Sequence, residues 1–310
     1  MKNKIIIGTR GSKLALWQTS FVKSQLEKTF PEIAFEINII KTTGDKILDS
    51  PLSQIGDKAL FTKELENALL KKEIDFAVHS LKDLPTQLPN GLALASVLER
   101  EKPNDVLISK NNLKLSELPK NAIVATGSLR RTSQLLHFRN DLRMIDLRGN
   151  VDTRFKKFDE SNWNAMLLAY AGVKRMNYGE RISEIISTEI LLPAVGQAAI
   201  GIETRSEENS VYEIVRSLNH DETEIAVKSE RAFLQRLEGG CLIPIGANAR
   251  IVNEKLFLQG MIASLNGKIL LRNSTNGNTN DAESLGISLA ETLLAKGGDK
   301  ILDEIRKGNS

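Results

Sequence analysis

The single cysteine of the chain, Cys241, lies in the run GGCLIPIG at 239–246. Glycine lets another group approach the backbone closely, and Pro244 keeps a helix from taking in the cysteine. We therefore expect the thiol on a loop, where another molecule can be attached to it. The alternative is a buried, inert thiol that packs as a small apolar side chain, and the flanking glycines favour attachment.

A lysine and an aspartate follow directly after a short apolar run. The run Ile74–Val78 is followed by HSLKDLP at 79–85, which contains Lys82 and Asp83. Ligands bind at the carboxyl ends of the strands in open α/β sheets, so we expect both side chains at a cleft. The alternative is an ion pair on a surface turn, which contributes little to stability.

The run ATGSLRR at 125–131 also follows an apolar stretch, and it opens a predicted helix. Free backbone N–H groups at a helix start favour anions, and the hydroxyls of Thr126 and Ser128 add donors. Arg130 and Arg131 in the first turn oppose the helix dipole. A bound anion would offset that cost. The alternative is that both arginine side chains point to solvent.

Basic residues recur where the predicted strands end. The planar fork of arginine forms two parallel hydrogen bonds with a carboxylate or a phosphate. With Asp83 as the one carboxylate among them, this array predicts a ligand that carries many negative charges. Its members are Arg10, Lys82, Arg130, Arg131, Arg148, Arg154 and Arg175.

Short apolar runs alternate with amphipathic stretches over the first two thirds of the chain, which is typical of sheets with helices on both faces. Apolar residues at helical spacing predict helices over Ser12–Phe30 and after Thr62. We interpret the runs Glu99–Pro103 and Leu192–Gly196 as two crossings between lobes that enclose a cleft. The predicted strands are Lys4–Ile7, Ala34–Ile40, Ile74–Val78, Asp105–Ser109, Ala122–Thr126, Arg143–Leu147 and Asn164–Ala169.

The last third has the pattern of a small α+β domain with Cys241 near its start. Asn266-Gly267 is a strong hairpin signal, because both residues tolerate positive φ. The run Asn273–Asn280 is biased toward polar turn residues. The predicted elements are helices over Ile225–Leu237 and Asp281–Leu294 and strands over Pro244–Val252, Lys255–Ala263 and Lys268–Arg272.

Composition is that of an ordinary globular chain of 310 residues, with 41% hydrophobic and 26% charged residues, which excludes a disordered or fibrous class. A net charge of +3 is too mild to indicate nucleic acid. One cysteine forms no internal disulfide, and we find neither a membrane span nor a signal peptide, so a cytoplasmic protein is expected. Neither common Gly-rich phosphate or dinucleotide motif is present, and the scattered His79, His137 and His220 predict no metal site.

These segments, in this order, resemble those of the porphobilinogen deaminase family, whose activity is also called hydroxymethylbilane synthase. The match spans nearly the whole chain, and the stretch Glu230–Gly246 is highly specific. The matching stretches are 7–15, 60–66, 79–85, 127–131, 148–154, 192–203 and 230–246.

The resemblance implies an α/β fold with two type II periplasmic-binding-protein-like lobes, joined by a double crossing, and a small C-terminal α+β domain. Lobe 1 would comprise residues 1–98 and 198–217, lobe 2 residues 104–193, and the C-terminal domain residues 221–310. The segment Asp49–Ala59 is similar to the mobile lid of the family. Cys241 matches the cysteine that carries a covalent dipyrromethane cofactor through a thioether bond.

The resemblance also implies a reaction. Four porphobilinogen units are joined head to tail on the dipyrromethane primer with loss of ammonia, and water then releases the linear tetrapyrrole 1-hydroxymethylbilane. Asp83 matches the aspartate that stabilises positive charge on a pyrrole and assists proton removal. The residues expected to bind cofactor or substrate carboxylates are Arg10, Ser12, Ser80, Lys82, Thr126, Ser128, Arg130, Arg131, Arg148, Arg154, Arg175 and Gln197.

Two positions depart from the family pattern. Gly127 stands where many relatives have serine, and Ala198-Ala199 replaces the usual Gly-Ala. The expected partner is the small molecule porphobilinogen, with no nucleic acid, no membrane and a monomeric chain.

Two other classes of protein fit less well. A binding protein or ligand-sensing regulator on the same scaffold leaves Cys241 unexplained. A cysteine-dependent acyl transferase needs a base near Cys241 that the sequence does not identify.

Overall fold

The computed structural model describes residues 3–43, 61–206, 209–239 and 243–308. Cys241 and the whole of the predicted lid, Asp49–Ala59, lie outside these residues. The chain forms two compact units. The first contains the described residues up to Glu101 and the segment Ala198–Glu224, and the second contains Lys102–Gln197 and the described residues from Ile225 onward.

The first unit is built on a five-stranded sheet in the order β2-β1-β3-β10-β4. β1 pairs in parallel with β2 and β3, whereas β10 runs antiparallel between β3 and β4. The sheet is therefore completed by a strand from the segment that returns to this unit late in the chain. The strands are β1 (Lys4–Thr9), β2 (Ala34–Ile39), β3 (Phe76–Ser80), β4 (Leu92–Val97) and β10 (Ile200–Arg205).

Helices cover both faces of this sheet. Successive residues of a strand point to opposite faces. Phe76 and Val78 of β3 join the apolar cluster that includes α1 (Lys13–Thr29) and α8 (Asn209–Arg216), and Ala77 joins the cluster of α4 (Lys63–Leu70). The carboxyl end of β3, where the predicted site begins, is thus held between two cores.

The second unit contains a sheet of the same design in the order β7-β6-β8-β5-β9. β6 pairs in parallel with β7 and β8, and β5 runs antiparallel between β8 and β9. Its strands are β5 (Asp105–Ser109), β6 (Ile123–Ala125), β7 (Arg143–Ile145), β8 (Ala165–Ala169) and β9 (Glu184–Ile185), and its helices are α5 (Leu129–Phe138), α6 (Val151–Asp159) and α7 (Tyr170–Arg175).

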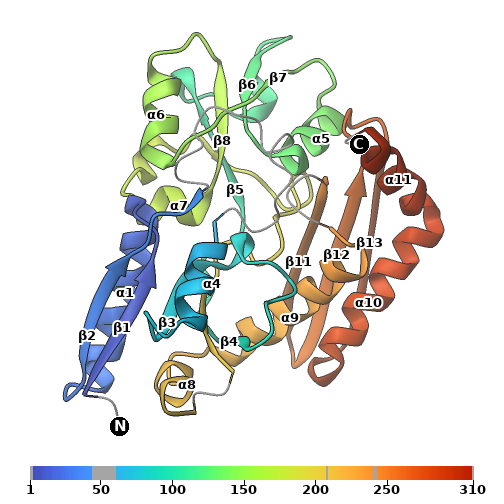
Figure 1. The fold of residues 1–310 in the computed structure, drawn as a ribbon. Coiled ribbons are helices and arrows are strands. Elements are labelled where there is room, and N and C mark those ends of the chain that lie inside the picture. The colour runs from blue at the N-terminus through green and yellow to red at the C-terminus, as the bar shows by residue number, and fades with distance from the viewer. Residues whose placement is uncertain (1–2, 44–60, 207–208, 240–242, 309–310) are drawn as a thin grey trace. The chain divides into compact units, whose positions relative to one another are not determined.

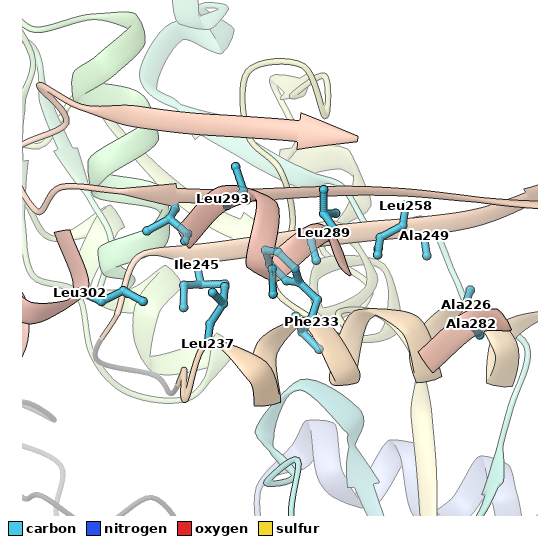
Figure 2. Packing of buried hydrophobic residues seen from close by; sticks show 14 of the residues in the cluster. Ala226, Phe233, Leu237, Ile245, Ala249, Leu258, Ala282, Leu289, Leu293 and Leu302 are labelled. Carbon is cyan, nitrogen blue, oxygen red and sulfur yellow. The ribbon is translucent and has the colours of Figure 1, made fainter. Parts of the chain in front are cut away.

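The second unit also contains an antiparallel meander, β11-β12-β13, packed with three helices (Figure 1). Figure 2 shows Phe233 of α9, and Leu237 directly after that helix, gathered with Leu289 and Leu293 of α10 beside β11 and β12. The elements are α9 (Asp221–Arg236), β11 (Ile245–Val252), β12 (Lys255–Ala263), β13 (Leu270–Asn278), α10 (Ala282–Leu293) and α11 (Asp299–Gly308).

The predicted fold class is confirmed. Two five-stranded mixed sheets share one arrangement of parallel and antiparallel strands, and a small α+β part follows them. In the described ranges the chain passes from one unit to the other after Glu101, after Gln197 and after Glu224. Two local predictions were wrong. β13 continues to Asn278 through the polar run, because every residue of it pairs with β12. Arg175, expected just after a strand, ends helix α7.

Ala198 has an unusual backbone conformation. Its φ is +74°, in the left-handed region that costs an L-residue roughly 1–2 kcal/mol. It is followed by Ala199, whose φ is not positive, and then by β10. The departure from glycine noted in the sequence therefore places strain at the point where the chain re-enters the first unit.

We expect Ala198→Gly to raise the free energy of unfolding by about 0.5–1 kcal/mol, because relief of the left-handed strain outweighs the added freedom of the unfolded chain. Ala199→Gly is the matched control and should lower that free energy, since no strain is relieved. Urea unfolding of both variants measures the difference. Equal effects of the two substitutions would show that the φ of Ala198 stores no strain.

Candidate active site

Asp83 ends a single 3-10 turn, η1 (Leu81–Asp83), that directly follows β3. The Leu81 N–H donates to Ala199 O at 3.0 Å, which fixes the start of the turn beside β10. No hydrogen bond or ion pair to another described residue engages the Asp83 carboxylate. The carboxylate is therefore available to a positively charged group.

Asp83 lines a hollow of about 70 Å³ in the first unit. Arg10, Ser12 and Ser80 line the same hollow, so the structure brings together four of the residues selected from the sequence. Lys82 lies in the same turn as Asp83 but is not among the lining residues.

Gln18 and Thr62 also line this hollow and were not selected from the sequence. Both are almost fully buried, and Gln18 Nε2 and Thr62 Oγ1 have no hydrogen-bond partner among the described residues. Ser80 Oγ donates to Gln18 Oε1 at 3.0 Å, which makes the NH₂ group the unsatisfied end of the amide. Buried donors without partners are costly. The hollow therefore suits a ligand that brings acceptors, such as carboxylate oxygens.

A polar residue on an apolar helix face is the signal that could have identified Gln18. It precedes Val22 by one turn of α1, and both are buried. Thr62 carries no comparable signal in the sequence, because threonine before a helix start is ordinary.

Arg10 and Ser12 are held by contacts of different kinds. The Arg10 guanidinium lies over the ring of Phe61, with Cζ 4.1 Å from the ring centroid, and this stacking orients the cation. Ser12 Oγ accepts the N–H of Ala15 at 3.3 Å and caps α1. Ser12 thus stabilises the helix start independently of any ligand.

In the second unit, Asp105 accepts hydrogen bonds from three residues that the sequence assigned to ligand binding. Arg130 Nη1 donates to Oδ2 at 2.8 Å, Arg131 Nε and Nη2 donate to Oδ1 at 3.0 and 2.8 Å, and Gln197 Nε2 donates to Oδ1 at 2.9 Å. Asp105 itself is fully buried and was not selected from the sequence. The signal for it was weak: an acidic residue at the start of an apolar strand.

The two arginines determine the ionisation of Asp105. Burial alone would raise the pKa of this carboxyl, but the charges of Arg130 and Arg131 and their hydrogen bonds outweigh burial and hold the pKa well below its ordinary value. Asp105 is therefore ionised throughout the neutral range. The alternative that both arginines point to solvent is wrong, because each is only 5% exposed.

Two guanidinium groups against one carboxylate leave an excess positive charge in this buried group of side chains. All three nitrogens of the Arg131 guanidinium already donate hydrogen bonds within the protein: Nε and Nη2 to Asp105, and Nη1 to Leu167 O at 3.1 Å. Arg130 donates through Nη1 alone, to Asp105 and to Leu192 O. Its Nε and Nη2 have no partner among the described residues, so Arg130 retains donors for an anion.

The hydroxyl oxygens of Thr126 and Ser128 serve the backbone at the start of α5. Thr126 Oγ1 accepts the Ser128 N–H at 3.3 Å, and Ser128 Oγ accepts the Arg131 N–H at 3.4 Å as the helix cap. Gly127 lies tightly between them, because a Cβ there would come within 2.7 Å of Leu147 O. Glycine at position 127 therefore fits against the Leu147 carbonyl, whereas serine at this position would require the backbone to shift.

The remaining arginines selected from the sequence are placed separately. Arg148 Nε donates to Asp146 Oδ2 at 2.9 Å, and Arg154 Nε donates to Gly149 O at 2.8 Å. Arg175 ends α7. Within the described ranges, no group of three or more metal-ligating side chains is found. None of the described helices is long and apolar enough to cross a membrane.

Comparison with known proteins identifies the family. Residues 5–213 match the family model "Porphobilinogen deaminase, dipyromethane cofactor binding domain", and residues 224–295 match "Porphobilinogen deaminase, C-terminal domain". The chain belongs to the porphobilinogen deaminase family. The porphobilinogen deaminase of Chlorobium limicola is 56% identical over 311 residues, covering 99% of each chain. Those of Chloroherpeton thalassium and Carboxydothermus hydrogenoformans are each 52% identical, covering 100% and 99% of each chain.

Among solved structures, the chain is similar to the periplasmic aliphatic sulphonate binding protein SsuA of Escherichia coli. The TM-score is 0.41 at 14% identity, over 77% of this chain and 71% of that one. That likeness concerns the fold alone.

We expect Asp105→Asn to lower the free energy of unfolding by about 3–5 kcal/mol at neutral pH, because two buried arginines lose their counter-charge. The pKa of Asp105 is depressed in the folded state, so its stabilisation is full above its unfolded pKa of about 3.9 and is lost as the pH falls through the folded value. The difference between wild type and variant should therefore shrink below about pH 4.

Urea unfolding at several pH values measures this difference. Asp159→Asn is the control, because it removes an exposed ion pair with Arg181 and should cost under about 1 kcal/mol. A difference that stays constant down to the lowest pH would contradict the ionised state of Asp105.

Proposed function

We propose that this chain polymerises four porphobilinogen units head to tail on a dipyrromethane primer, releases ammonia at each step and frees 1-hydroxymethylbilane by hydrolysis. It is a transferase of tetrapyrrole biosynthesis. The observation that carries the proposal concerns the hollow in the first unit. Among the described residues, the Asp83 carboxylate has no hydrogen-bond or ion-pair partner there, and the buried donors Gln18 Nε2 and Thr62 Oγ1 have no acceptor. A ligand with both carboxylates and a developing positive charge fits that combination.

The donor set suits the dipyrromethane cofactor, whose pyrroles bear carboxylate side chains. Two observations favour such a polyanion: Arg130 has donors without a partner in the described part of the chain, and the side chains around Asp105 carry an excess positive charge. When bound, the cofactor supplies the pyrrole carbon to which the first substrate unit is joined. We propose that Cys241 attaches it through a thioether, an assignment supported by the glycine-framed run at 239–246.

We propose that Asp83 is the catalytic carboxylate. Loss of ammonia from porphobilinogen leaves positive charge on the pyrrole, and an ionised carboxylate close to the pyrrole N–H stabilises that charge. Arg10, held over Phe61, supplies a fixed cation for a substrate carboxylate in the same hollow.

We propose that the other selected residues bind cofactor or substrate carboxylates in two ways. Arg130 binds directly, whereas Arg131 and Gln197 act through Asp105, which they hold in place. Ser80 acts through Gln18, whose Oε1 accepts the Ser80 hydroxyl proton. Direct binding is proposed for the remaining basic and hydroxyl residues, namely Ser12, Lys82, Thr126, Ser128, Arg148, Arg154 and Arg175.

The finer assignments from the sequence stay predictions. They are the three domains at 1–98 with 198–217, 104–193 and 221–310, the lid at Asp49–Ala59, a cytoplasmic location, a monomeric state and the absence of nucleic-acid partners.

Cys241→Ser should abolish stable attachment of the primer, because an oxygen cannot form the thioether. The intact mass of the wild-type protein should exceed that of the bare chain by two porphobilinogen units less two ammonia, with the excess on the peptide that contains Cys241. The serine variant should have the bare mass and an unchanged far-UV spectrum. A pyrrole mass that persists in the variant would move the attachment elsewhere.

Asp83→Asn should lower kcat by about a hundredfold or more while the covalent primer is still carried, because charge stabilisation is lost but the donors remain. Ammonia release measures the rate, and intact mass measures the primer. A wild-type protein that gains no pyrrole mass and releases no ammonia with porphobilinogen would favour a binding protein over an enzyme.

A further inference from the structure

A buried pair of ionisable side chains lies beside Asp83 and has no part in the function proposed above. His79 of β3 and Glu203 of β10 are 5% and 0% exposed, and His79 Nε2 lies 3.0 Å from Glu203 Oε2. The strands are antiparallel neighbours with His79 opposite Gly201, so His79 and Glu203 lie on one face of the sheet. This face is the one covered by α4.

The surroundings of Glu203 determine how the pair is protonated. His79 is its only side-chain partner among the described residues, and Glu203 Oε1 has none. A buried carboxylate without a donor or a cation is costly. The imidazole therefore donates its Nε2–H to Glu203, and the carboxylate stabilises the imidazolium whenever the ring takes up a second proton.

The other ring nitrogen faces a different environment. Nδ1 of His79 has no partner among the described residues, and His79 lines the hollow that contains Asp83. Arg10 and Asp83 are the other charged groups of that hollow, and α4 brings the buried Glu66 to the same face of the sheet. With Nε2 engaged by Glu203, Nδ1 is the basic atom left for a ligand.

We propose that His79, held by Glu203, is the base that completes each coupling, while Asp83 stabilises the positive charge. This inference rests on the proposed function. Once the new carbon–carbon bond has formed, the pyrrole carbon still carries its hydrogen. Nδ1 accepts it as a proton, and the electron pair of the C–H bond returns to the ring. The imidazolium then gives the proton to the released ammonia, which leaves as ammonium.

Two substitutions separate this role from a structural one. A glutamine amide nitrogen reaches the position of Nε2, so His79→Gln keeps the hydrogen bond to Glu203 but removes Nδ1. Glu203→Gln keeps an acceptor for Nε2–H but removes the charge that stabilises the imidazolium. We expect His79→Gln to lower kcat by about a hundredfold, with KM and the covalent primer unchanged, and Glu203→Gln to lower kcat by about tenfold.

His137→Gln is the matched control. The Nδ1 of His137 lies 2.9 Å from Gly267 O, and His137 belongs to the second unit, whereas Asp83 belongs to the first. Wild-type turnover by His79→Gln, with the primer present, would overturn the proposal and leave the pair a structural one. Absence of primer and of ammonia release in the wild type would instead refute the proposed function.

A spectroscopic measurement tests the same geometry without turnover. The chain has 3 histidines, so ¹⁵N-histidine labelling of the holoprotein yields three imidazoles, and the signals that disappear in His79→Gln belong to His79. We expect His79 to carry its proton on Nε2, with Nδ1 unprotonated, and to lose that preference in Glu203→Gln. A wild-type tautomer with the proton on Nδ1 would overturn the proposal.

Discussion

The buried carboxylate of Asp105 organises the second unit. Asp105, the first residue of β5, accepts hydrogen bonds from two arginines in the first turn of α5 and from Gln197. Gln197 is the last residue of the second unit before the chain returns to the first. Three segments that are distant in the sequence are thereby held at one point. Asp105 carries one negative charge against the two positive charges of Arg130 and Arg131. This buried group therefore holds the second unit together and is also a source of positive potential.

A second carboxylate ties the adjacent segment to the C-terminal sheet. Glu230 of α9 accepts the Gly196 N–H at 2.8 Å through Oε2 and the Ala249 N–H at 2.7 Å through Oε1. The run 192–197 is therefore fixed from both sides, at Gln197 by Asp105 and at Gly196 by Glu230.

The elements with regular apolar patterns could be predicted from the sequence. The predicted strand Asp105–Ser109 and the predicted strand Lys255–Ala263 have the observed bounds, because each is an apolar run with clear breaks. β13 could not be predicted to its full length, since its outer part is polar and is a strand only through pairing with β12. Local propensity is weaker than such pairing.

The residues of the candidate site likewise include some that could be predicted from the sequence and some that could not. Asp83 and the arginines could be selected because charged residues at strand ends are conspicuous. The buried carboxylates that pair with Arg130, Arg131 and His79 could not. Asp105 lies at the start of a strand and Glu203 inside one, where their neighbours come from other strands and helices. Which arginine retains free donors follows only from the distances to Asp105 and to the carbonyls of Leu167 and Leu192. Such pairing depends on the three-dimensional arrangement and leaves no trace in residue spacing.

The polar outer half of β13 affects how copies of this chain meet. β13 is an edge strand, and an edge presents backbone N–H and C=O groups that another strand could join. Residues 273–278 read NSTNGN, a run of asparagine, glycine and small hydroxyl side chains. These residues contribute little to cross-strand packing, so a strand added from a second copy would bury almost no apolar surface. The polar composition that kept the outer half of β13 from being predicted as a strand thus also protects the edge of the sheet against aggregation.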